Sequence, residues 1–340
     1  MSQLKTAVVI LNWNGRKFLE QFLPNLMACT GEAATLIVAD NHSSDDSVSF
    51  MQKQYPQIQL IQNNENGGFA KGYNDALAQL DAQYYVLLNS DIEVTPHWIE
   101  PIIEMMDKDP QIACCQPKLR SYHKRNFFEY AGAAGGFIDY LGYPFCRGRI
   151  FESIEEDLGQ YDEVCEVFWA TGAALFVRAD LYQQYGGLDA DFFAHQEEID
   201  FCWRMKNLGY KNMYCPQSVV YHIGGGTLPK SSAHKTYLNF RNNLSLLYKN
   251  LPQKELKKVF LYRFILDLIA TLRFLCKGSF AEVKAVFRAY IDFYKIKEHN
   301  KAKRAQFVQK DDLSCMWQRS LVWNYYIRKI RTFKQIHFPF

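Results

Sequence analysis

Short apolar runs alternate with stretches of helical periodicity over the first 117 residues, and no other feature constrains the fold as strongly. Short runs rich in Val, Ile and Leu predict strands that are buried on both faces. Strands that alternate with helices predict a mostly parallel sheet covered on both sides. The predicted strands are 7–12, 35–40, 58–62, 84–89 and 112–117, and the predicted helices are 16–28, 45–54, 68–80 and 96–108.

Polar side chains stand where these predicted strands end. Asn12 and Asn14 follow the first strand, and Asp40 ends the second. Asn89 and Asp91 end the fourth. In open α/β sheets the ligand crevice lies outside the carboxyl ends of the strands. The sequence therefore predicts a polar ligand site at this edge of the sheet.

The segment Asn89-Ser90-Asp91 has two interpretations. A carboxylate at the tip of a buried strand is an oxygen ligand of the kind that Mg²⁺ or Mn²⁺ prefers, and such an ion neutralises charge on a departing diphosphate. The alternative is an aspartate that caps the turn before the next helix. That helix is expected to begin with Thr95 as its N-cap and Pro96 as its first residue.

Asp40 also has two interpretations, because it precedes a loop of small polar residues. It could recognise the base or ribose of a nucleotide, or it could cap the helix that follows. Ser43, Ser44 and Asp45 lie nearer to that helix and are good N-cap residues. The cap therefore does not account for Asp40.

Gly67, Gly68 and Gly72 surround the start of the third predicted helix, and Asn74 follows one turn later. Glycines at a helix start let a ligand approach the backbone closely. The segment lacks the GKS or GKT of a P-loop and does not fit the GxGxxG dinucleotide pattern. The glycines therefore indicate a ligand-binding loop that is neither a P-loop nor a dinucleotide-binding loop.

A second acidic group precedes a helix that is predicted to end near Gly209. Glu197, Glu198 and Asp200 could supply a general base beside an acceptor hydroxyl. The alternative is a stabilising role, because carboxylates are favoured at a helix N-terminus. His222, at the end of a strand that runs into a glycine-rich loop, is either a structural histidine or a ligand of the same pocket.

The C-terminal part of the chain differs in charge from the rest. The chain reads as helical from about Ala233. Residues 251–340 carry 19 Lys and Arg against 7 Asp and Glu, a balance of +12, whereas residues 1–250 carry 20 against 29, a balance of −9. Aromatic and aliphatic residues are interleaved with these basic residues, which is typical of helices that lie on an anionic membrane face. The alternative is a helical subdomain that packs on the body or in a homodimer. No stretch approaches the roughly 18 uncharged residues of a spanning helix.

The nine cysteines are an odd number without metal-type CxxC spacing, which predicts free thiols in a reducing cytoplasm. The apolar run at the N-terminus is too short for a signal peptide and is expected to form the first strand. The acidic body and the absence of a recognised module exclude a nucleic-acid partner.

Seven blocks in this order resemble glycosyltransferase family 2, and most closely its bacterial rhamnosyltransferase-like branch. The resemblance covers roughly residues 6–245. It implies an α/β GT-A nucleotide-diphospho-sugar transferase fold over 1–245 and a basic amphipathic helical region over 246–340. The blocks are VVILNWNG, IVADNHSSDDS, NGGFAKGYN, LLNSD, WATGAALFVR, QEEIDFCWR and VVYHIGGGT.

The resemblance also implies roles for individual residues. Asp91 would coordinate the divalent cation, Mg²⁺ or Mn²⁺, with His222 as a further ligand, and Asn89 would bind the ribose. Trp169, Thr171 and Gly172 would shape the sugar and acceptor site. The nucleotide-binding residues implied are Asn12, Trp13, Asn14, Gly15, Asp40, Gly68, Lys71, Gly72, Asn74, Asn89 and Ser90.

Two residues depart from the family pattern. Asn89 replaces the first acid of the DxD motif, and an amide is the poorer metal ligand. Glu198 stands where the family commonly has the aspartate that acts as the base. Its extra methylene moves the carboxylate by about one C–C bond, a shift to which reaction geometry is sensitive. Either the site is adjusted to Glu198, or Asp200 or Glu197 takes that role.

The function implied is an inverting, metal-assisted transfer of a sugar to a hydroxyl of a glycan or lipid-linked acceptor in cell-surface polysaccharide synthesis. The donor would be dTDP-rhamnose or a UDP-sugar, with GDP-sugars left open because no motif in 118–170 encodes the choice. The localisation expected is peripheral, on the cytoplasmic face of the inner membrane. The alternatives are an inactive sugar-nucleotide-binding scaffold and a sugar nucleotidyltransferase, although LNWNGRKFLE lacks the glycine-rich signature of the latter.

Overall fold

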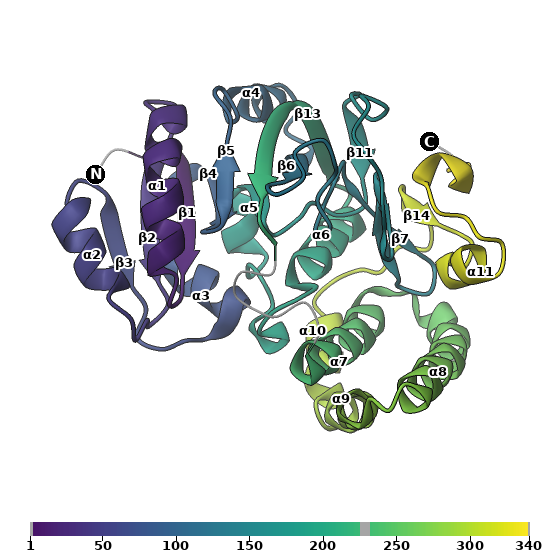
Figure 1. Cartoon of the computed structure of the whole chain (residues 1–340). Coiled ribbons are helices and arrows are strands. Elements are labelled where there is room, and N and C mark those ends of the chain that lie inside the picture. The colour runs from purple at the N-terminus through teal and green to yellow at the C-terminus, as the bar shows by residue number, and fades with distance from the viewer. Residues whose placement is uncertain (1–2, 225–231, 339–340) are drawn as a thin grey trace.

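A nine-stranded sheet forms the centre of the computed structural model, which describes residues 3–224 and 232–338 (Figure 1). The strand order is β11-β13-β6-β12-β4-β1-β2-β3, and β5 pairs with β13. The strands are β1 (Leu4–Asn12), β2 (Thr35–Asp40), β3 (Gln59–Gln62), β4 (Ala82–Asn89), β5 (Ile92–Val94), β6 (Ile112–Ser121), β11 (Cys165–Val167), β12 (Ala174–Arg178) and β13 (Lys211–His222).

The sheet is mostly parallel, as the alternation of strands and helices predicted. β1 pairs in parallel with β2 and β4, and β2 with β3. β12 lies antiparallel between β4 and β6, and β6 pairs in parallel with β13. β1, β2, β3, β4, β6 and β13 therefore run in one direction, so their carboxyl ends share one edge.

Helices cover both faces of this sheet, because each strand buries alternate residues on opposite sides. Ala7 and Val9 pack in one core, whereas Val8 and Ile10 pack in the other. The first core includes side chains of α3, α5 and α6, and the second includes side chains of α1, α2 and α4. The helices are α1 (Arg16–Thr30), α2 (Ser47–Gln54), α3 (Gly68–Leu77), α4 (Glu100–Lys108), α5 (Ala179–Gln184) and α6 (Glu197–Leu208).

The predicted start of α4 at Pro96 is wrong by one turn. His97 has a φ of 60°, a left-handed conformation that cannot begin an α-helix. Thr95 Oγ1 instead donates to the carbonyl of Val219, 2.8 Å away. The helix begins at Glu100.

A second, smaller sheet lies beside the first and has the order β10-β9-β8-β7-β14. Its last strand comes from the far end of the chain and pairs in parallel with β7, Met316 opposite Ile138. The strands are β7 (Gly136–Asp139), β8 (Pro144–Cys146), β9 (Arg149–Ile150), β10 (Ser153–Ile154) and β14 (Met316–Trp317).

This strand pairing shows that the C-terminal region differs from the helical region that was predicted. The predicted boundary between 245 and 246 falls inside α7. The chain after α10 is not a continuous helical region, because β14 and two short helices pack on the body. The helices are α7 (Ala233–Asn250), α8 (Gln253–Cys276), α9 (Phe280–Lys295), α10 (Lys297–Arg304) and α11 (Leu321–Tyr326), with 3₁₀ turns at Ala190–Phe192 and Phe333–Ile336.

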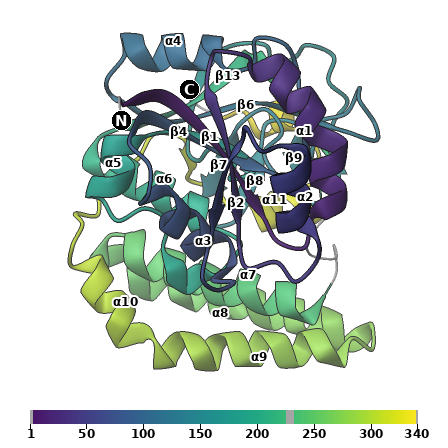
Figure 2. The same ribbon diagram turned by 90° about the vertical axis from the view of Figure 1, so that its left-hand side faces the viewer.

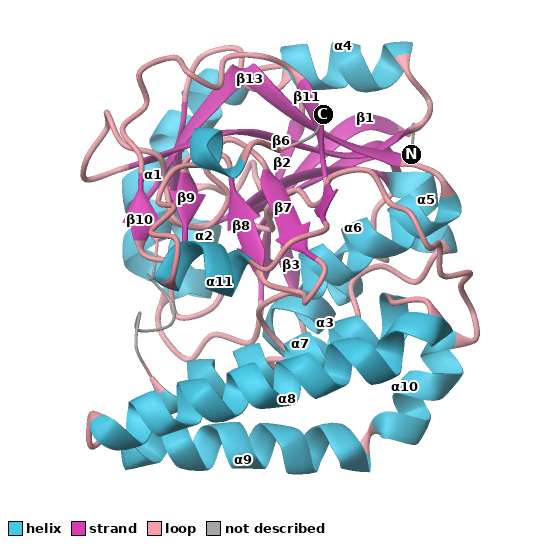
Figure 3. Cartoon of the chain, turned by 90° about the vertical axis from the view of Figure 1, so that its right-hand side faces the viewer, coloured by secondary structure: helices cyan, strands magenta, loops and turns pink. Residues whose placement is uncertain are grey.

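α8 is the longest of these helices, and α8 and α9 lie side by side along one side of the molecule (Figures 2 and 3). Across residues 3–224 and 232–338, no helix has the length and apolar character needed to cross a membrane. All nine cysteines are free thiols, as predicted.

Candidate active site

The predicted meeting of polar side chains at the sheet edge is confirmed. Asn12 lies opposite Asp40 in the β1–β2 register, and Leu11 lies opposite Asn89 in the β1–β4 register. Asn12 Nδ2 donates to Asp40 Oδ1 over 3.1 Å and lies 3.2 Å from Ser43 Oγ. Both Asn12 and Asp40 are buried, so the first two strands present one fixed polar pair at the crevice.

The loop after β1 is shaped by Asn14 and Gly15. Asn14 has a φ of 49°, and its Oδ1 accepts the backbone N–H groups of Ser44 at 2.7 Å and Asp45 at 3.2 Å. A Cβ at Gly15 would lie 2.4 Å from Asn12 Oδ1, so a side chain does not fit there. Trp13 is 42% exposed beside them, which leaves its ring open for stacking.

Close protein contacts require two of the glycines at the start of α3, and the predicted approach of a ligand to this loop stays a prediction. A Cβ at Gly68 would collide with Phe193, and one at Gly72 would lie 2.9 Å from Asn41 Oδ1. Lys71 pairs with Asp75 at 2.5 Å and is partly exposed.

Asn74, one of the nucleotide-binding residues that the resemblance implies, makes three hydrogen bonds to protein groups. Its Nδ2 donates to the carbonyl of Leu188 at 2.7 Å, and its Oδ1 accepts from Tyr182 Oη at 2.7 Å and from the Leu188 backbone at 3.1 Å. These bonds fix the loop before α6 to α3.

Asp91 and His222 come together from β4–β5 and the end of β13. His222 Nε2 lies 3.1 Å from Asp91 Oδ1 and 3.4 Å from Asn89 Nδ2. Burial alone would raise the pKa of Asp91, but the imidazole holds it below its usual value. The sequence placed these two groups in one pocket. Gly225, Gly226 and Thr227 of the glycine-rich block after His222 lie outside the described residues.

Glu129 is a third member of this group that no sequence motif indicated. Its Oε2 lies 3.3 Å from His222 Nδ1, and its side chain is buried. Burial alone would lower the pKa of His222, but Glu129 and Asp91 raise it to about 10. Glu129 belongs to the loop-rich region 118–166, where only the fold brings it against β13.

The residues present fit part of a cation site. Among residues 3–224 and 232–338, no group of three or more His, Cys, Asp and Glu side chains could hold a metal ion. Asp91 and His222 can supply one oxygen and one nitrogen ligand. A divalent cation there would draw its remaining ligands from the diphosphate and from water.

Glu198 lies in the first turn of α6, next to the strand that follows Gly172. A Cβ built on Gly172 would lie 3.6 Å from Glu198 Cβ, and the Asn89 backbone N–H donates to the neighbouring Ala173 carbonyl at 2.9 Å. Burial raises the pKa of Glu198 to about 7, although backbone N–H groups lower it in part. Its Oε2 accepts no hydrogen bond. These features suit a general base.

The two alternative bases have different surroundings. Asp200 is fully buried and bonds Arg204 at 3.0 Å, Lys249 at 2.9 Å and Asn250 at 2.8 Å, so it holds α6 to α7. These bonds favour a structural role for Asp200. Burial, followed by repulsion from Glu198, raises the pKa of Glu197 well above its usual value, and its Oε2 also lacks a hydrogen-bond partner. Glu197 is buried whereas Glu198 is half-buried, so Glu198 is the more accessible of the two.

Trp169 and Thr171 support the site from within the core. Trp169 Nε1 donates to the Phe137 carbonyl at 2.8 Å, and its ring is buried. Thr171 Oγ1 donates to the carbonyl of Ala131, and its N–H donates to Gln116 Oε1 at 3.0 Å. These bonds fix the backbone beside Gly172. The structure therefore favours a supporting role for the two side chains over direct contact with a sugar.

Known proteins share this sequence pattern and this fold. The family model described as Glycosyl transferase family 2 matches residues 7–165. An N-acetylglucosaminyl-diphospho-decaprenol L-rhamnosyltransferase of Mycobacterium tuberculosis (strain CDC 1551 / Oshkosh) is 25% identical over 230 residues, which cover 63% of this chain and 75% of that protein.

Two solved structures are similar in fold. GalNAc-T7 with UDP, GalNAc and Mn²⁺ superposes with a TM-score of 0.58 and 16% identity, over 74% of this chain and 49% of that chain. Residues 1–349 of S. aureus TarS with UDP-GlcNAc superpose with a TM-score of 0.57 and 15% identity, over 88% of this chain and 83% of that chain. This chain thus spans about half the length of the GalNAc-T7 structure.

The fold is that of the GT-A glycosyltransferases. The chain is similar over residues 7–165 to glycosyltransferase family 2, and the proteins it resembles include a bacterial rhamnosyltransferase, in agreement with the resemblance of its motifs.

Proposed function

We propose that this protein transfers a sugar from a nucleotide-diphospho-sugar to a hydroxyl of a glycan or lipid-linked acceptor, with inversion at the anomeric carbon. The observation that carries the proposal is Glu198, a half-buried carboxylate with a raised pKa and an unpartnered oxygen. Glu198 lies against Gly172, and the carbonyl of the next residue, Ala173, accepts the backbone N–H of Asn89.

In this mechanism Glu198 accepts the proton of the acceptor hydroxyl. The hydroxyl oxygen forms a bond to the anomeric carbon as the bond from that carbon to the diphosphate breaks, and the nucleoside diphosphate leaves with the electron pair. Asp91 and His222 would hold a divalent cation, Mg²⁺ or Mn²⁺, which supplies charge neutralisation for the diphosphate. Asn12, Trp13 and Asp40 would orient the nucleotide.

The names of the relatives support the substrate classes. The mycobacterial relative is named for transfer of L-rhamnose to a diphospho-decaprenol lipid carrying N-acetylglucosamine. We therefore favour dTDP-rhamnose or a UDP-sugar as the donor and a lipid-linked acceptor for cell-surface polysaccharide. The GalNAc-T7 structure contains UDP and Mn²⁺, which supports the choice of cation.

Such an acceptor places the protein at a membrane surface. We propose a peripheral location on the cytoplasmic face of the inner membrane, supported by the +12 balance of residues 251–340 and by nine free thiols. A homodimer through the same helices is the competing arrangement.

The test is release of nucleoside diphosphate from dTDP-, UDP- and GDP-sugars, with and without Mn²⁺ or Mg²⁺ and with a lipid-linked acceptor. Metal-dependent turnover of one donor is expected. A second candidate, an inactive sugar-nucleotide-binding scaffold, is favoured by Asn89 in the first DxD position. Nucleotide binding without turnover of any donor would establish the scaffold instead.

A further inference from the structure

Helix α8 turns apolar side chains to solvent along its length. The spacing of three and four residues puts them on one face. Each is 45–60% exposed, and none is covered by another part of the described chain. This outer face of α8 consists of Leu261, Phe264, Ile265, Leu268, Ile269, Leu272 and Leu275.

Two charged side chains in the middle of the helix, Arg263 and Asp267, are buried on the opposite side. Arg263 pairs with Asp267 at 3.0 Å, and Tyr290 Oη of α9 donates to Asp267 at 2.8 Å. The Arg263 guanidinium also lies 4.1 Å from the centre of the Tyr143 ring. These contacts fix the rotation of α8, so the apolar residues cannot turn inward without breaking a buried ion pair.

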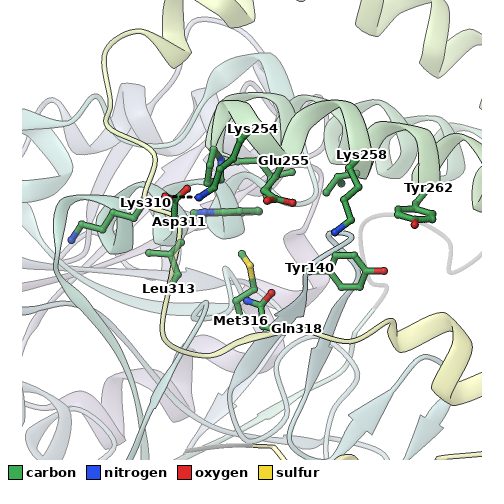
Figure 4. Close-up of a pocket in the computed structure, with 14 residues that line it drawn as sticks. Tyr140, Lys254, Glu255, Lys258, Tyr262, Lys310, Asp311, Leu313, Met316 and Gln318 are labelled. Atoms are coloured by element: carbon green, nitrogen blue, oxygen red, sulfur yellow. Dashed lines mark ion pairs between the residues drawn. The ribbon is translucent and has the colours of Figure 1, made fainter.

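The first turns of α8 also carry charged side chains on the inner side of the helix. A cavity of about 470 Å³ separates them from the segment 310–318. Lys258 and Tyr140 point into it, and Lys254 pairs with Asp311 at 2.8 Å at its edge (Figure 4). The inner side of these turns thus carries polar side chains at the cavity, next to Leu256 and Val259, which pack in the core.

Neighbouring helices extend the outer face. On α9, Phe280, Phe287, Ile291 and Tyr294 are 56–68% exposed. Arg273 Nη1 of α8 lies 3.1 Å from Tyr326 Oη of α11, whose turn also exposes Trp323 and Ile327. We call the outer face of α8 together with these residues of α9 and α11 the docking face.

The charges around the docking face have one sign. Between residues 256 and 295 every exposed charged side chain is basic, because Asp267 is buried and Glu282 and Asp292 are half-buried. Asp292 is paired with Lys295 at 3.0 Å. Lys258 points into the cavity on the inner side, and the other exposed basic residues are Lys257, Arg273, Lys277, Lys284, Arg288 and Lys295.

We propose that the docking face lies in the plane of an anionic lipid surface, with its apolar side chains among the acyl chains and its basic side chains at the headgroups. Large apolar residues flanked by Lys and Arg, with Trp and Tyr at the margin, suit the membrane interface. A symmetric pair of these faces would bring like charges together, which disfavours a dimer. The inference deepens the proposed function, since it names the surface on which a lipid-linked acceptor would be met.

The test is flotation of the full chain with vesicles of phosphatidylcholine, with and without phosphatidylglycerol, at low and high salt. Binding that rises with phosphatidylglycerol is expected. The variant L268E/L272E should lower the partition coefficient by about tenfold or more, because two apolar side chains are lost and two anionic ones are added. The matched control L158E changes a leucine that is 78% exposed on the body and should bind like the wild type.

Three results would overturn the inference. They are no binding to either vesicle, equal loss of binding in L158E, and a dimer in solution that L268E/L272E dissociates. Nucleotide-induced thermal shifts, measured on the same variants, separate this inference from the proposed function. Vesicle binding without turnover of any donor would leave the docking face standing and the transferase proposal refuted.

Discussion

The sheet edge around Asp91 and the helix α8 both bury charged side chains, but they leave opposite kinds of group open. At the sheet edge, Glu198 keeps a carboxylate oxygen without a partner. In α8, Arg263 and Asp267 are paired with each other and with Tyr290, and the open groups are leucines and aromatic rings. A half-buried carboxylate oxygen without a partner indicates a site of chemistry, whereas an exposed apolar face indicates a partner.

The largest effect is expected at the sheet edge. Asp91→Ala removes the carboxylate that is proposed to bind the cation beside the diphosphate, and turnover should fall by about 10³-fold. Metal-dependent nucleotide binding, followed by calorimetry, should weaken in parallel. Asp81→Ala is the control, because its exposed carboxylate bonds Gln3 far from the site. Equal turnover in the two variants would contradict the role of Asp91.

On α8 the largest effect is expected on stability. Arg263→Met leaves Asp267 buried without its ion-pair partner, and the free energy of unfolding should fall by about 3–5 kcal/mol. Leu268→Ser, on the outer face, should change it by no more than about 0.5 kcal/mol. Urea unfolding of both variants measures the difference. A large loss in Leu268→Ser would show that the outer face packs against protein.

Glu129 should act through His222 rather than on the substrate. Glu129→Gln keeps the shape of the side chain but removes the charge next to His222 Nδ1, and affinity for Mn²⁺ in the presence of nucleotide should fall by about 10–100-fold. Electron paramagnetic resonance of free Mn²⁺ measures that affinity directly. The control Glu156→Gln alters an exposed glutamate of the same loop region. Unchanged Mn²⁺ affinity in Glu129→Gln would mean that Glu129 only holds the backbone of Ala131.

The smallest effect is a dependence on pH. Because the pKa of Glu198 is raised to about 7, the carboxylate is protonated below that pH and cannot accept the acceptor proton. The value of kcat/KM should therefore fall about tenfold for each pH unit below 7 and level off above it. A profile that stays flat from pH 5 to pH 8 would contradict Glu198 as the base.

The sequence predicted the parallel sheet because strands buried on both faces are continuous apolar runs. The convergence of Asn12, Asp40 and Asn89 followed from their positions at strand ends. The start of α4 was wrong because Thr95 and Pro96 fit an N-cap locally, while the contact with Val219 that holds Thr95 is made by a strand 124 residues away.

The remaining differences also come from tertiary contacts. Asp200 and Glu198 belong to the same acidic group in the sequence, but Asp200 faces α7, where it pairs with Lys249 and accepts a hydrogen bond from Asn250. Glu129 carries no local signal, and the segment after α10 joins the second sheet through one short strand. The apolar residues of α8 were visible in the sequence, but its buried ion pair was needed to show which face points outward.

The central claim is that Glu198 removes the proton from the acceptor, and a comparison with its neighbour tests it most directly. Release of nucleoside diphosphate in the presence of acceptor should be measured for the wild type, Glu198→Gln and Glu197→Gln. Glu198→Gln should lower kcat by about 10²–10⁴-fold and leave nucleotide binding unchanged. Glu197→Gln should retain activity, because the side chain of Glu197 is buried and less accessible to an acceptor hydroxyl than that of Glu198. Full activity in Glu198→Gln, or its loss only in Glu197→Gln, would contradict the account.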